Sequence, residues 1–151
     1  MPSNQPIGIF DSGFGGLTVA RAIIDLLPSE DIVYFGDTSR YPYGPQPLEE
    51  VKSYSQQISD YLIEEHDVKM IVIACNTASA AAEGDLRNST EIPIVGVITP
   101  GAQAVAEVSS TKKIGVIGTV GTINSQAYDN AIKGISPENI EPVSYTHLTL
   151  P

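Results

Sequence analysis

The stretch Met70-Ile-Val-Ile-Ala-Cys-Asn-Thr-Ala-Ser-Ala-Ala-Ala82 decides the fold of this chain. Its first part is an unbroken apolar run, which is typical of a strand buried on both faces of a parallel sheet. Its second part is rich in alanine, the residue with the strongest helix preference. Cys75, Asn76 and Thr77 therefore lie where a strand gives way to a helix. In open α/β folds this carboxyl edge of the sheet is where ligands bind.

Cys75 is the only cysteine of the sequence, and it has two interpretations. Free cysteines are often small apolar core residues without a chemical role. A thiol at the start of a helix instead lies at the positive end of the helix dipole, which favours the reactive thiolate. The polar residues Asn76 and Thr77 favour the second interpretation, because a buried strand does not normally end in Cys-Asn-Thr unless it meets something polar. They offer an amide and a hydroxyl beside the free N–H groups of the helix start.

Composition argues against several classes of protein. The 151 residues carry a formal net charge of −10, which disfavours binding to nucleic acid or to an anionic membrane surface. No apolar run reaches the roughly 20 residues that a membrane helix needs, and the N-terminus shows no signal peptide. A single cysteine excludes an internal disulfide, so a cytoplasmic location is expected. No group of His and Cys has the spacing of a metal site.

The chain opens with a strand, a glycine-rich turn and a helix, the start of a βαβ unit. We predict the strand over residues 6–10, the turn over 11–16 and the helix over 17–27. The turn has neither the spacing of a dinucleotide-binding motif nor the Gly-Lys-Ser/Thr of a P-loop, but its glycines let backbone N–H groups approach an anion. Asp11 ends the strand, where a carboxylate either caps the next helix or serves a site, and both roles can coexist.

A second strand is predicted over residues 31–35, followed by a long loop over 36–45 that contains tyrosines and prolines. Such loops are more often recognition loops than spacers, although a rigid turn with tyrosines on the edge of the core is the alternative. Arg40 is the only positive side chain near the three strand-end loops. Apolar spacing predicts a helix over residues 48–66, with His66 interacting with its C-terminal dipole.

Strands and helices continue to alternate beyond residue 82. Further strands are predicted at 92–98 and 113–118, and helices at 99–108 and 119–132. Thr99 is expected to cap the first of these helices, with Pro100 at its first position. This alternation predicts an α/β fold with a doubly wound parallel sheet. After Gly134 the pattern dissolves, and from about Val143 we expect no regular element tied to the sheet.

Several motifs, taken together and in this order, resemble the glutamate racemase family. The resemblance covers residues 7–132. The stretches that carry it are residues 7–19 (IGIFDSGFGGLTV), 34–38 (YFGDT), 41–44 (YPYG), 74–79 (ACNTAS), 95–102 (VGVITPGA) and 114–119 (IGVIGT).

The resemblance implies two similar flavodoxin-like α/β domains that face each other across a cleft. Residues 1–98 would form the first domain without its C-terminal return segment, 99–142 the truncated beginning of the second, and 143–151 a non-native tail. The family interconverts L- and D-glutamate without a cofactor and supplies D-glutamate for peptidoglycan. The implied partner is this small-molecule substrate, with no nucleic acid, no membrane and no metal, and with a homodimer possible in the full-length form.

Carried over residue by residue, the resemblance makes Cys75 one of two acid/base cysteines that act from opposite faces of the α-carbon. Asp11 would assist its proton transfers, and Asp37 would have a supporting role. The substrate's amino and carboxylate groups would be bound by Ser12, Tyr43, Gly44, Asn76 and Thr77. The second cysteine motif of the family, Gly-Cys-Thr-His, does not occur in this chain. We therefore expect an inactive N-terminal fragment.

Two other interpretations stay open. One is an aspartate- or hydantoin-type racemase, which shares the logic of two cysteines. The other is a non-catalytic, flavodoxin-like domain that uses the glycine-rich turn to bind an anion. Cys75-Asn76-Thr77 argues against the second, because a binding module has no need of a reactive thiol.

Overall fold

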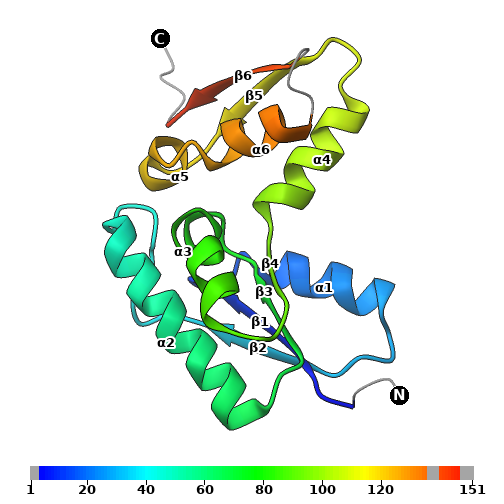
Figure 1. Ribbon diagram of the computed structural model, residues 1–151, viewed down its shortest axis with the longest axis vertical. Helices are drawn as coiled ribbons and strands as arrows, with labels where there is room; N and C mark the ends of the chain where they lie inside the picture. Colours follow the sequence, from blue (N-terminus) through cyan, green and yellow to red (C-terminus); the bar gives the residue numbers. More distant parts are fainter. Residues whose placement is uncertain (1–3, 136–139, 147–151) are drawn as a thin grey trace.

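The computed structural model describes residues 4–135 and 140–146, and its elements form two groups joined through one short connection (Figure 1). The first group has a four-stranded sheet of order β2-β1-β3-β4, in which all neighbouring strands are parallel. Its strands are β1 (Ile7–Asp11), β2 (Ile32–Gly36), β3 (Met70–Ile73) and β4 (Ile94–Gly96). Its helices are α1 (Leu17–Leu26), α2 (Leu48–His66) and α3 (Asn76–Ser89).

Both faces of this sheet are covered by helices, as the alternation of elements predicted. Phe10, Ile71 and Ile73 are buried against α2 and α3, while Ile9 and Val72 are buried against α1 on the other face. Side chains alternate between the faces of a strand, so a central strand covered on both sides must be apolar throughout. The doubly wound parallel sheet is confirmed.

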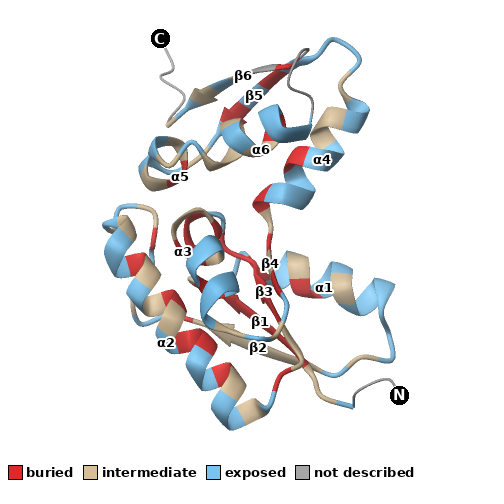
Figure 2. Cartoon of the chain, in the orientation of Figure 1, coloured by how far each residue is buried: buried red, intermediate tan, exposed pale blue. Residues whose placement is uncertain are grey.

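The face under α1 is the less completely covered of the two. An apolar groove of about 420 Å³ runs between α1 and the segment from β4 to Pro100. Ile23, Val72 and Val95 are among the residues that line it, and Leu26 at its rim is 77% exposed. Figure 2 shows α1 with exposed residues along much of its outer surface.

The second group contains α4 (Ile98–Val108), β5 (Lys113–Ile117), α5 (Val120–Asn124), α6 (Ala127–Ile135) and β6 (Glu141–Tyr145). Its small core includes Ala102, Ile114, Val116, Ile132 and Ile140, all of them buried. In the described part of the chain, no helix is both long and apolar enough to cross a bilayer.

The expectation that no regular element follows Val143 is wrong for residues 143–145. They belong to β6, which pairs in parallel with β5 from Lys113↔Glu141 to Ile117↔Tyr145. The strand was missed because it contains Pro142, a residue that disfavours a strand assignment. It also lacks the apolar run of a central strand, and Val143 and Tyr145 are both 51% exposed. Residues 147–151 lie outside the described part of the chain.

Two helix boundaries also differ from the prediction. Residues 119–132 form α5 and α6 rather than one helix, because Gln126 has a left-handed backbone (φ 55°) and Ser125 bonds locally, donating to the Thr122 carbonyl and accepting from Ala127 N–H. The helix expected to start at Thr99 starts at Ile98, with Val97 as its cap residue. Thr99 is therefore not the cap.

Candidate functional site

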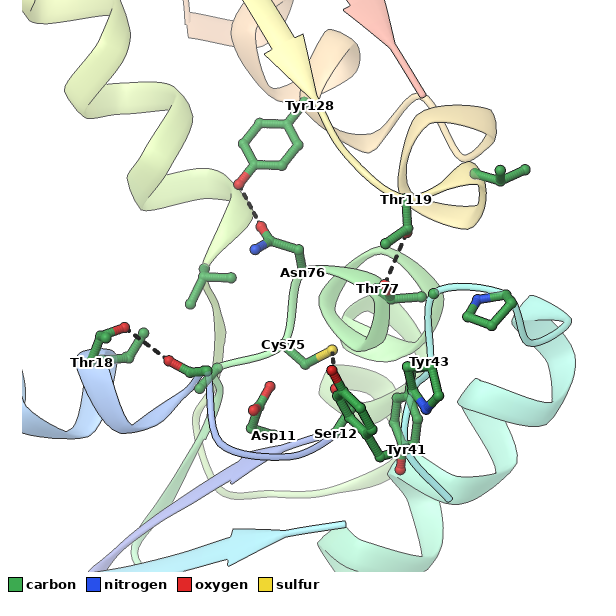
Figure 3. A pocket seen from close by; sticks show the side chains of 18 of the residues that line it. Asp11, Ser12, Thr18, Tyr41, Tyr43, Cys75, Asn76, Thr77, Thr119 and Tyr128 are labelled. Atoms are coloured by element: carbon green, nitrogen blue, oxygen red, sulfur yellow. Dashed lines mark hydrogen bonds between the residues drawn. The ribbon is translucent and has the colours of Figure 1, made fainter. Parts of the chain in front are cut away.

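A pocket of about 780 Å³ lies at the carboxyl edge of the large sheet, where the second group of elements faces it (Figure 3). It is lined by the loops that follow β1, β2 and β3 and by the starts of α5 and α6. Asp11, Tyr43 and Cys75 all line it, as their positions after three parallel strands predicted. Of the other residues named from the sequence, Ser12, Gly44, Asn76 and Thr77 also line the pocket, and Asp37 does not.

Asp11 anchors the glycine-rich turn from the end of β1. Its Oδ2 accepts hydrogen bonds from Gly13 N–H (3.1 Å) and Gly16 N–H (3.0 Å), although the residue is only 5% exposed. Gly16 must be glycine for steric reasons, since a Cβ there would lie 2.7 Å from Asp11 Cβ and 2.8 Å from Ala74 Cβ. The carboxylate thus holds the turn and lines the pocket, whereas α1 has Gly16 as its cap residue and no side-chain cap.

Cys75 is the cap residue of α3 and presents its sulfur to the pocket. Its Sγ accepts a long hydrogen bond from Ala78 N–H (3.5 Å) in the first turn of α3 and lies 3.6 Å from Ser12 Oγ. Figure 3 shows Asp11, Ser12 and Cys75 grouped together on one side of the pocket. At the edge of the pocket the sulfur therefore has a backbone donor and the Ser12 hydroxyl in contact, with the Asp11 carboxylate close by.

Tyr43 is fixed by Asp37 beneath it. The phenol donates to Asp37 Oδ2 (2.5 Å), and Arg40 Nε lies 2.6 Å from the same oxygen. Burial and this hydrogen bond raise the pKa of Tyr43, so its hydroxyl stays protonated. Arg40 also lies over the ring of Tyr54, at 4.4 Å from the centroid. Asp37 thus supports Tyr43, and Arg40 pairs with Asp37 and with side chains of α2 rather than lining the pocket.

Tyr34 supports the glycine-rich turn that follows β1. Its hydroxyl donates to the Gly13 carbonyl (3.2 Å), which adds a second tie to the glycine-rich turn. Burial, followed by the nearby charges of Asp11 and Cys75, raises the pKa of Tyr34 to about 12. The phenol therefore remains a donor at any physiological pH.

Thr119 and Tyr128 of the second group also line the pocket, with Thr122 behind Thr119, and none of the three was named as a site residue from the sequence. Thr77 Oγ1 lies 3.1 Å from Thr119 Oγ1, which in turn lies 2.9 Å from Thr122 Oγ1. The Tyr128 hydroxyl donates to Asn76 Oδ1 at 2.6 Å (Figure 3). The contacts of Thr77 with Thr119 and of Asn76 with Tyr128 span 42 and 52 residues along the chain, so no local pattern could predict them. The one available signal was the density of hydroxyl side chains between residues 119 and 128.

The pocket is suited to a small anion that also carries a positive group. None of the described residues that line it is Lys, Arg or His, so negative charge has to be met by N–H and hydroxyl donors. The start of α3 supplies N–H groups at the positive end of a helix dipole, whereas the first N–H groups of α1 are hydrogen-bonded within the glycine-rich turn. Asp11 supplies the single carboxylate among the lining residues. Together these groups match the mixed charges of an amino acid.

The chain is similar to known proteins along most of its length. A model of the Asp/Glu/hydantoin racemase family matches residues 8–144. The chain is 55% identical over 134 residues to a glutamate racemase of Geobacter metallireducens and 48% identical over 137 residues to one of Enterococcus faecalis. These matches cover 89% and 91% of this chain but only 49% and 50% of the relatives.

Solved structures give the same result. Glutamate racemase RacE1 from Bacillus anthracis matches with a TM-score of 0.89 and 46% identity. A glutamate racemase from Francisella tularensis, solved in complex with D-glutamate, matches with a TM-score of 0.84 and 44% identity. Each match covers 93% of this chain and 52% of the solved chain. The chain spans about half the length of the relatives that it matches.

Proposed function

Because the chain belongs to the Asp/Glu/hydantoin racemase family, we propose that it is the N-terminal part of a glutamate racemase and that its pocket takes glutamate. One observation carries the proposal: the Cys75 thiol faces the pocket beside Asp11 and Ser12, among N–H and hydroxyl donors. The Francisella relative is described as a complex with D-glutamate, which supports the choice of ligand.

In this proposal the substrate is held by groups from all three strand-end loops. Ser12, Thr77 and the backbone of Gly44 donate hydrogen bonds to carboxylate oxygens, as does the amide of Asn76. Tyr43 forms the wall beside Gly44, and Asp37 keeps it in place. The start of α3 adds N–H donors, so a dicarboxylate binds despite the negative net charge of the chain.

Cys75 is the proposed acid/base residue. As a thiolate it takes the α-proton of one glutamate enantiomer, and as a thiol it returns a proton to the same face. Asp11 keeps one oxygen in the turn and assists proton transfer at the sulfur with the other. Inversion requires a second acid/base group on the opposite face, and Cys75 is the only cysteine here. The chain by itself should therefore exchange the α-proton slowly, without racemising glutamate.

The wider setting follows from the same proposal. The full-length protein would supply D-glutamate for peptidoglycan in the cytoplasm, without a cofactor, nucleic acid or membrane partner, and would be able to form a homodimer. Residues 1–98 would belong to its first domain and 99–142 to its second. In the first domain, the apolar groove beside α1 would be covered by a returning segment of the longer chain.

The test is to incubate the purified chain with D-glutamate in D₂O. NMR follows deuteration at the α-carbon, and chiral chromatography follows the enantiomer ratio. We expect slow deuteration without L-glutamate, loss of deuteration in Cys75→Ala, and weaker deuteration of D-aspartate. Fast formation of L-glutamate that depends on Cys75 would refute the fragment interpretation. Absence of both glutamate binding and Cys75-dependent deuteration would refute the assignment of the pocket.

A further inference from the structure

We propose that Tyr128 is a positioning residue that orients the Asn76 side-chain amide, so that its NH₂ group faces the pocket as a hydrogen-bond donor. The inference rests on the proposed function, because it specifies how the pocket meets a substrate carboxylate. Figure 3 shows the two side chains pointing toward each other from α6 and from the start of α3.

The contact occupies only one end of the amide. The Tyr128 hydroxyl donates to Asn76 Oδ1 at 2.6 Å. In the described part of the chain, no hydrogen bond is formed by Asn76 Nδ2, and Asn76 is an exposed residue that lines the pocket. With its oxygen engaged by the phenol, the amide has its two N–H donors left for a ligand.

The direction of this hydrogen bond follows from the needs of the phenol. Burial raises the pKa of Tyr128, so the hydroxyl keeps its proton and is the donor in this contact. Asn76 Oδ1 is the acceptor that the described residues supply. If the amide rotated by half a turn, the phenol proton would lose its partner and Oδ1 would face the pocket. A carboxylate offers only acceptors, so the rotated amide would oppose it.

The arrangement also depends on both groups of elements. Tyr128 lies on α6 and packs near Gly101 of α4, where a Cβ added to Gly101 would lie 3.5 Å from the Tyr128 hydroxyl oxygen. Asn76 belongs to α3, beside the large sheet. The amide is therefore set only when α6 lies over the start of α3, so the placement of the second group controls a donor of the substrate site.

The experiment uses the complete ¹⁵N-labelled chain and the variants Tyr128→Phe, Asn76→Ala and the combination of both. Tyr61→Phe is the matched control, because it removes a phenol hydroxyl that contacts His66 away from the pocket. Side-chain amide NMR spectra report on Asn76, whose signals are identified by their loss in Asn76→Ala. Titration with L- and D-glutamate gives Kd, and urea unfolding checks that each variant is folded.

We expect Tyr128→Phe to shift the Asn76 amide signals and to raise the Kd for glutamate about three- to tenfold, the effect of losing one hydrogen bond. In the Asn76→Ala background the same substitution should leave Kd unchanged, because Tyr128 acts through Asn76. Tyr61→Phe should change neither readout. Unchanged Asn76 signals in Tyr128→Phe, or an equal loss of affinity with and without Asn76, would overturn the inference. If the parent chain does not bind glutamate, the proposed function fails, and the amide signals alone still decide whether Tyr128 orients Asn76.

Discussion

Replacing Gly16 with alanine should destabilise the chain by about 1–3 kcal/mol, the usual cost of overpacking a tight site. The backbone itself gives no reason for this loss. Gly16 has φ −65° and ψ −12°, a right-handed helical conformation that alanine adopts readily. At such a position alanine normally stabilises a protein by about 0.4–1 kcal/mol, because it restricts the unfolded chain. The expected sign is therefore set by the neighbours of the new methyl group.

The atoms around the new methyl group cannot move aside without a cost in free energy. The added Cβ would lie 2.7 Å from Asp11 Cβ, 2.8 Å from Ala74 Cβ and 3.0 Å from the Tyr34 hydroxyl oxygen. Two of these atoms are β-carbons, which move only with the backbone. The glycine-rich turn must shift instead, and the shift stretches the 3.0 Å hydrogen bond from Gly16 N–H to Asp11 Oδ2. We expect weaker glutamate binding for the same reason.

Urea unfolding followed by circular dichroism measures the effect, with the m-value checked for constancy. Gly15→Ala is the matched control, because the nearest atom to its Cβ is Asp11 Oδ2 at an ordinary 3.8 Å. The control should be neutral or stabilising by up to about 1 kcal/mol. If Gly16→Ala and Gly15→Ala unfold at the same urea concentration, the steric account of the turn is wrong.

Three further outcomes are expected. Tyr43→Phe should lower the free energy of unfolding, measured in urea, by about 1.5–3 kcal/mol, because buried Asp37 keeps its ion pair with Arg40 but loses the charge-assisted hydrogen bond from the phenol. A decrease near zero would contradict this. The pKa of Tyr34 is raised from an ordinary 10.0 to about 12 in the folded chain, so its contribution to the free energy of unfolding is complete below pH 10 and is lost as pH rises toward 12. Absorbance at 295 nm, which follows phenol ionisation, should show one fewer late-ionising phenol in Tyr34→Phe. Leu62→Ala removes a fully buried side chain between α2 and the sheet and should cost about 2–5 kcal/mol by calorimetry or urea unfolding, with a value below 1 kcal/mol arguing against that packing.

The large sheet was predictable because its signal is local. The apolar run at Met70 fixes a buried strand, and the alanine-rich stretch after Cys75 fixes a helix, so the junction between them could be placed from thirteen residues. The rule that parallel strands share a carboxyl edge then brought Asp11, Tyr43 and Cys75 together without any knowledge of distances. The structure places all three around one pocket.

The second group of elements was less predictable because its determinants are not local. The break between α5 and α6 depends on the hydrogen bonds of Ser125 and on the left-handed backbone of Gln126. Glutamine has no particular preference for that conformation, so the sequence did not predict it. The strand β6 is set by its partner β5 rather than by its own periodicity. Tyr128 reaches Asn76 across 52 residues, and only the packing of α6 over α3 creates that contact.

The apolar groove beside α1 bears on the temperature dependence of stability. Heat capacity rises on unfolding in proportion to the apolar surface that becomes newly hydrated, on average about 12–15 cal/mol/K per residue. Side chains such as Leu26, along with parts of the groove lining, are already hydrated in the folded chain. Unfolding therefore adds less apolar hydration than it would in a closed domain of equal length. The curve of unfolding free energy against temperature is correspondingly flatter, and cold denaturation moves further below the temperature of maximum stability.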